Sequence, residues 1–196
     1  MRSSVWIGLF SLICTSICRG QDKAQTQFIE SYFSKSNFSR PEKLVYEKGL
    51  WKFETEDIRK SLVKDTIFSL GYKYESINNR LILSEEERKQ IDNQLDSLSS
   101  NNWYESLHLE NAQAVSQDTI KAIFDNNLDL GWQHFRTKYG RELYHFSKPI
   151  LFRNNTLCLF YYGNTCGSFC GEGYLTLFKK EQGSWVKWFI LYSWVS

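Results

Sequence analysis

The chain has 196 residues, with 24 Lys and Arg against 22 Asp and Glu, and 16% of its residues are aromatic. This length suits one folded domain, and the aromatic content together with only two prolines excludes an intrinsically disordered chain. The near balance of charge gives no basis for nucleic acid or an anionic membrane surface as partner.

Residues 1–20 are predicted to be a secretory signal peptide. An apolar run over residues 5–18 follows a basic start, and small residues stand three and one positions before a cleavage point at Gln21. The run is shorter than the ~20 residues that span a bilayer, which argues against a membrane anchor at this segment. We expect no transmembrane segment in the mature chain. A lipoprotein attached through Cys18 is the weaker alternative, because Ile17 stands where such signals have a small residue. We expect an exported bacterial protein, periplasmic or extracellular.

Cleavage removes Arg2 and Arg19 but no acidic residue, so the mature chain carries 22 basic and 22 acidic side chains. We expect residues 21–196 to form a single α+β domain. Its residues 21–140 are predicted to be mainly helical, and residues 141–196 are predicted to be the antiparallel β part.

The first part of the mature chain begins with an expected helix over residues 21–34, since its apolar side chains recur on one side. Residues 43–79 give a mixed pattern. Short strands are possible at 44–46 and 50–53, and a helix can begin after Thr55.

A capping box predicts the next helix. The Ser84 hydroxyl can accept from the amide of Glu87, and the Glu87 carboxylate can reach back to Ser84. An apolar stripe follows at Ile91, Leu95 and Leu98. The acidic run is therefore interpreted as a solvated helix start and not as a metal site.

Two further helices are predicted before residue 140. Ser116 can cap a short helix that ends near Asn126. The aromatic side chains of Trp132, Phe135 and Tyr139 then recur at helical spacing. We interpret this stripe as core that packs onto a sheet.

From Leu143 onward the hydrophobic period changes to that of strands. Four β-rich runs cover residues 143–147, 156–163, 172–180 and 185–196. Their short connectors favour hairpins. The predicted fold is therefore N-terminal helices packed on a C-terminal antiparallel four-stranded meander sheet.

Three cysteines remain after cleavage. Cys166 and Cys170 share one loop and are the expected disulfide, worth roughly 2 kcal/mol in the chain-entropy model. Cys158 falls within a strand and is expected to be a small buried core residue. A zinc site or a redox role is the less favoured reading, because the spacing is C-x-x-x-C and no further ligand pair lies nearby.

The loop that follows Cys166 also contains Gly167, Gly171 and Gly173. Glycines tolerate left-handed backbone conformations, so the loop can present amides to an anion. The favoured reading is that these glycines only let the chain turn around a disulfide and re-enter the sheet, since no basic cluster adjoins them.

The C-terminal part carries a set of short motifs. They are Pro149-Ile150-Leu151-Phe152, the Cys-Gly-x-x-Cys-Gly-x-Gly loop from Cys166 to Gly173, Lys179-Lys180, Gly183-Ser184-Trp185 and the terminal Trp194-Val195-Ser196. In these motifs, over roughly the last 55 residues, the chain resembles an uncharacterised family of small exported proteins from Bacteroidetes-type bacteria. This chain departs from the pattern at Ser168-Phe169 and Cys158. The resemblance implies a fold and an exported compartment, and no activity.

Two functions remain open. The first is a non-enzymatic domain that binds a protein, peptide or glycan through aromatic side chains, which are common at recognition surfaces but also fill cores. The candidate binding residues are Tyr161, Tyr162, Tyr174, Trp188, Trp194 and Glu172.

The alternative is a hydrolase or redox enzyme with a site at the Cys166–Cys170 loop, using Glu172 and His145. Glu142 and His145 lie three apart on an expected strand and therefore point to opposite faces. No nucleophile–base arrangement stands out in the sequence, so we lean towards a non-enzyme with no cofactor and no metal.

Overall fold

The fold is described from a computed structural model. It describes residues 22–34, 43–48, 56, 59–60, 62, 66–68, 80–97, 107, 109–125 and 127–196. The chain divides into two compact units, residues 1–36 and residues 37–196. In the first unit, residues 22–34 form a helix, as predicted. The predicted signal peptide and the possible strand at 50–53 lie outside the described residues.

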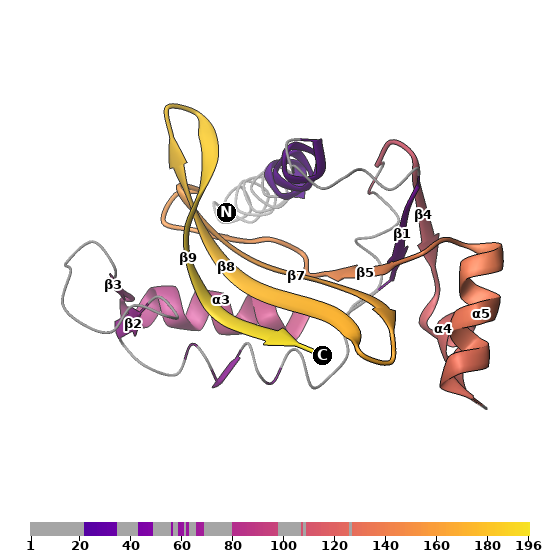
Figure 1. The fold of residues 1–196 in the computed structure, drawn as a ribbon. Coiled ribbons are helices and arrows are strands. Elements are labelled where there is room, and N and C mark those ends of the chain that lie inside the picture. Colours follow the sequence, from indigo (N-terminus) through magenta and orange to yellow (C-terminus); the bar gives the residue numbers. More distant parts are fainter. Residues whose placement is uncertain are drawn as a thin grey trace, which may run out of the picture. The chain divides into compact units, whose positions relative to one another are not determined.

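The second unit is built on a seven-stranded sheet with the order β4-β1-β5-β7-β8-β9, in which β6 also pairs with β7 (Figure 1). Its strands are β1 (Leu44–Glu47), β4 (Ala112–Val115), β5 (Leu143–Phe146), β6 (Ile150–Phe152), β7 (Leu157–Gly167), β8 (Cys170–Glu181) and β9 (Ser184–Val195). A separate two-stranded sheet pairs β2 (Thr66–Phe68) with β3 (Arg80–Ile82).

The α+β class is confirmed, and the strands β7, β8 and β9 form the expected antiparallel meander. The predicted count of four antiparallel strands is corrected to a mixed sheet of seven. Three strands are added to the four that were predicted: β6 pairs with β7, and β1 pairs in parallel with both β4 and β5. β1 coincides with the short strand that was possible at 44–46, whereas β4 and β6 were not predicted. β4 has four residues and β6 has three, which is too short for alternation to separate a strand from a loop.

Three helices of this unit are α3 (Glu85–Ser97), α4 (Gln117–Phe124) and α5 (Leu128–Lys138). The predicted caps are present in two of them. The Ser84 hydroxyl accepts from the Glu87 amide at 3.2 Å, and the Ser116 hydroxyl accepts from the Thr119 amide at 3.2 Å. The N-terminal cap of α5 was not predicted. It is Asn127, whose Oδ1 accepts from the Leu130 amide at 2.9 Å.

One face of the sheet, called here the helix face, carries Leu159, Tyr161 and Leu177. Residues paired directly across antiparallel strands share a face, which places these three together. Ile91 and Leu95 of α3 belong to the same hydrophobic cluster as these strand residues. A second cluster joins α4 and α5 to the β1, β4 and β5 end of the sheet, through Val45, Val115, Ile120, Trp132, Phe135 and Leu143.

The opposite face, called here the aromatic face, carries a row of rings that crosses neighbouring strands. Ring centroids are 5.2 Å apart for Tyr46 and Phe146, 6.3 Å for Phe146 and Phe160, and 6.5 Å for Phe160 and Phe178. Such offset and edge contacts are favourable beyond the burial of the rings alone. Along β7 and β8, apolar side chains therefore point to both faces of the sheet.

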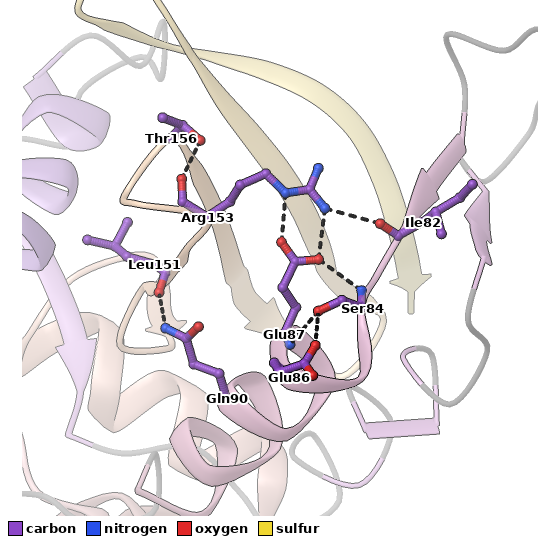
Figure 2. Close-up of polar contacts among 8 residues, drawn as sticks. All are labelled: Ile82, Ser84, Glu86, Glu87, Gln90, Leu151, Arg153 and Thr156. Atoms are coloured by element: carbon purple, nitrogen blue, oxygen red, sulfur yellow. Dashed lines mark hydrogen bonds and ion pairs between the residues drawn. The ribbon is translucent and has the colours of Figure 1, made fainter.

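The start of α3 is tied to the turn between β6 and β7, as Figure 2 shows. The guanidinium of Arg153 donates to both carboxylate oxygens of Glu87, at 2.7 and 2.8 Å, and to the carbonyl of Ile82 at 3.1 Å. Arg153 and the next two residues, Asn154 and Asn155, all have φ between 51° and 58°. A left-handed conformation is costly for a residue with a side chain, so the bidentate ion pair helps to hold this turn.

Candidate functional site

The disulfide predicted between Cys166 and Cys170 is present, and it closes the turn between β7 and β8. Gly167 is the last β7 residue paired across the turn, and its partner is Cys170. Ser168 and Phe169 therefore form the tip of a short, covalently closed hairpin. The remaining cysteine, Cys158, is free and fully buried, as expected. Burial raises the pKa of its thiol well above the ordinary range.

The closed turn is attached to α5 by two hydrogen bonds. Ser168 Oγ donates to Asp129 Oδ1 at 3.0 Å, and the Arg136 guanidinium donates to the Cys166 carbonyl at 2.7 Å. The Arg136 guanidinium also lies 5.9 Å from the centre of the Trp132 ring. The tip is thus held both by its own disulfide and by a helix distant in sequence.

Three exposed apolar side chains are sequence neighbours of the two residues that make this attachment. The described part of the chain has six exposed large hydrophobic side chains, and three of them stand next in sequence to Ser168 or Asp129. They are Leu128, Leu130 and Phe169, and Phe169 is 92% exposed. We call these three residues the clasp patch. Single exposed hydrophobic side chains are ordinary on a protein surface, so exposure makes these three residues candidates for an interaction and does not by itself define a site.

The loop glycines were expected to let the chain turn, but the structure gives Gly171 and Gly173 a role in packing. None of Gly167, Gly171 and Gly173 has a left-handed φ. They lie in extended strands, so the reading in which the loop presents a left-handed nest to an anion is not supported. A side chain at Gly173 would instead collide with the indole of Trp194, since a Cβ there would lie 2.1 Å from Trp194 Nε1. A Cβ added at Gly171 would also lie 3.0 Å from Cζ3 of this ring.

The absence of side chains lets Trp194 lie flat on the sheet. Its indole Nε1 donates to the hydroxyl of Tyr161 at 2.9 Å. Tyr161 itself is completely buried. Packing against Trp194 therefore accounts for the glycines at 171 and 173, whereas Gly167 has no such contact.

The six candidate binding residues do not form one surface. Tyr161 and Trp194 lie on the helix face, and Trp188 packs against the same cluster. Glu172, Tyr162 and Tyr174 lie on the aromatic face. Tyr161 and Tyr162 are buried, whereas the other four are partly exposed. The structure therefore groups three of the six residues with each face of the sheet and does not bring all six into one surface.

On the aromatic face, two carboxylates hold tyrosine hydroxyls. Tyr174 donates to Glu172 at 2.7 Å, and Tyr144 donates to Glu142. The hydrogen bond to Glu172 raises the pKa of Tyr174. Burial, followed by the contact with Glu142, raises the pKa of Tyr144. Both tyrosines therefore remain protonated donors and are unsuited to act as bases near neutral pH.

His145 lies on the helix face, away from these carboxylates. Its Nδ1 is 3.7 Å from Glu47 Oε2, and both side chains are buried. Gly163 and Gly173, which pair in register with His145, carry no side chain that could join it. His145 and Glu172 therefore point to opposite faces, and the arrangement expected for the alternative enzyme site is not assembled.

A groove of about 390 Å³ runs along α3. Its floor is apolar, while its rim mixes acidic and basic side chains, among which Arg59 pairs with Asp92. The rim has no single prevailing kind of functional group.

Within the described residues, no group of three His, Cys, Asp or Glu side chains has a geometry that could hold a metal ion. Across the same residues, no helix has the length and apolar character needed to cross a membrane.

The clasp patch was missed in the sequence, although a signal was present. Leu128 and Leu130 fall outside the Trp132, Phe135 and Tyr139 stripe and are apolar residues at the start of an amphipathic helix.

Comparison with known proteins found no matching family model, no similar curated protein and no similar solved structure.

Proposed function

We propose that this chain is an exported, non-enzymatic domain that binds a protein or peptide partner through the clasp patch. The observation that carries the proposal is Phe169, a large aromatic side chain 92% exposed at the tip of a disulfide-closed turn. Aromatic side chains are enriched among residues that dominate binding energy. The compartment rests on the predicted signal peptide and on the resemblance to exported proteins.

The support for binding is the rigidity of the patch. A backbone that is already fixed loses less conformational entropy when a partner covers it. The disulfide fixes the tip, and the bonds from Ser168 and Arg136 fix the tip against α5. Leu128 and Leu130 extend the apolar surface from the helix. The alternative hydrolase or redox function receives no comparable support, since His145 and Glu172 lie on opposite faces.

Site-specific photo-crosslinking in the producing cell tests the proposal. A photoreactive phenylalanine analogue placed at position 169 is expected to give a discrete crosslinked product with another protein. The matched control is the same analogue at Gln182, an exposed residue at the tip of the β8–β9 turn. Equal products from both positions, or none from position 169, would contradict binding at the clasp patch.

A further inference from the structure

The β8–β9 hairpin extends past the end of β7 and carries a second surface of different chemistry (Figure 1). In the register of this hairpin, Lys180 lies directly opposite Trp185, and Phe178 lies directly opposite Lys187. Opposite residues share a face, and so do residues two apart on one strand. Lys180, Trp185 and Lys187 therefore lie together on one side of the hairpin.

This side of the hairpin is cationic. Lys180 and Lys187 are exposed, and no ion pair joins either to a carboxylate in the part of the chain that is described. The one acidic residue of the hairpin end, Glu181, lies on the other face, where it pairs with Lys179 at 2.6 Å. Two ammonium groups thus flank one indole, and none of the described carboxylates pairs with either of them.

The indole supplies a flat apolar surface between the two charges. The Lys180 ammonium lies 5.7 Å from the centre of the Trp185 ring. An exposed cation–π contact of this kind is worth only about 0.5–1 kcal/mol, so Lys180 can turn towards an anion at little cost. A ligand that suits this side has a ring to lie on the indole and carboxylates to meet the lysines.

We propose that the Lys180, Trp185 and Lys187 side of the hairpin binds an anionic polysaccharide with carboxylate-bearing sugar rings. Each uronic acid unit offers an apolar ring face and one negative charge, which matches the alternation of indole and ammonium groups. A lipid surface fits less well. The turn at the hairpin tip, from Glu181 to Ser184, is polar and carries an acid, so it is not built to enter a bilayer. This site is independent of the clasp patch.

The test is equilibrium binding of polygalacturonate to the purified mature chain at several salt concentrations. The fully methyl-esterified polymer, which has the same rings without charge, is the ligand control. Lys180→Gln with Lys187→Gln is expected to weaken binding about tenfold and to flatten its salt dependence. Trp185→Ala is expected to weaken binding about fivefold.

The matched variant removes the same charge elsewhere, by Lys89→Gln with Lys138→Gln, and both positions are exposed. It is expected to bind within about twofold of the parent, since surface changes of this kind leave stability nearly unchanged. An equal loss in both double variants, no binding by the parent, or tighter binding to phosphatidylglycerol vesicles than to polygalacturonate would overturn the proposal.

Discussion

The indole of Trp194 lies directly on Gly173, on the neighbouring strand, and a Cβ at Gly173 would come within 2.1 Å of its Nε1. The same nitrogen donates to the buried hydroxyl of Tyr161 at 2.9 Å. A glycine that looks like part of a loop motif is therefore a packing position for the last strand. This relationship links the disulfide-closed turn to the core of the sheet.

Gly173→Ala is expected to displace the indole and break its hydrogen bond, which lowers the free energy of unfolding by about 2–4 kcal/mol. Denaturant unfolding measures this loss. Gly167→Ala is the matched control within the same motif, because its Cβ would meet only the flexible end of Arg136, at 3.4 Å, and Cys170. A loss for Gly173→Ala no larger than for Gly167→Ala would contradict the packing role.

Replacement of both Cys166 and Cys170 by serine is expected to lower the free energy of unfolding by about 2 kcal/mol, because the disulfide closes only a small ring. The chain should still unfold cooperatively. The crosslink from position 169 should weaken, since the tip loses its covalent constraint. Loss of cooperative unfolding would show that the disulfide supports the whole fold.

Arg153→Gln is expected to destabilise the protein by about 1 kcal/mol at pH 7, because it breaks the bidentate pair with Glu87. The hydrogen bond from Arg153 lowers the pKa of the Glu87 carboxyl. A lowered folded-state pKa gives stability that is present above the unfolded value, about 4.3, and lost as the pH falls through the folded value. The difference between the parent and Arg153→Gln should therefore shrink on acidification.

Unfolding curves of both proteins from pH 7 to pH 3 measure this trend. The control is Glu181→Gln, which removes the exposed pair with Lys179 and should change stability by only a few tenths of a kcal/mol. A difference for Arg153→Gln that stays constant with pH would show that Glu87 is not the group involved.

The thiol count gives a separate check on the cysteines. Of the five cysteines, three remain after the expected cleavage before Gln21. That mature chain in its native state is expected to show no thiol that reacts with an alkylating reagent, because Cys158 is buried and its pKa is raised. One thiol should appear on unfolding and three after reduction of the unfolded chain. Intact mass after alkylation measures each count, and a native chain with two or more reactive thiols would contradict the pairing of Cys166 with Cys170.

Local signals in the sequence were sufficient for the helices and the meander. Ser84 and Ser116 cap helices through their own neighbours, and the pairing of β7 with β8 follows from a short closed turn. β1 coincides with the short strand that was possible at 44–46, but its place in the sheet was not predicted, and β4 was not predicted at all. They pair in parallel with partners distant in the chain, and this pairing leaves no local pattern in four residues.

The candidate site was predicted only in part, for the same reason. The pairing of Cys166 with Cys170 follows from their spacing. The role of Gly173 depends on Trp194, which lies on another strand, and the clasp patch depends on a bond between Asp129 and Ser168, 39 residues apart. Contacts of this kind are set by tertiary structure and are not encoded by a motif.

The most direct test of binding at the clasp patch is the affinity of the purified chain for the partner identified by crosslinking, compared with that of Phe169→Ser. Removal of a central aromatic anchor is expected to weaken binding by about 2 kcal/mol, roughly 30-fold. Val186→Ser, at another exposed apolar position, should leave the affinity unchanged. Unchanged affinity for Phe169→Ser, in a chain of parental stability, would contradict the account.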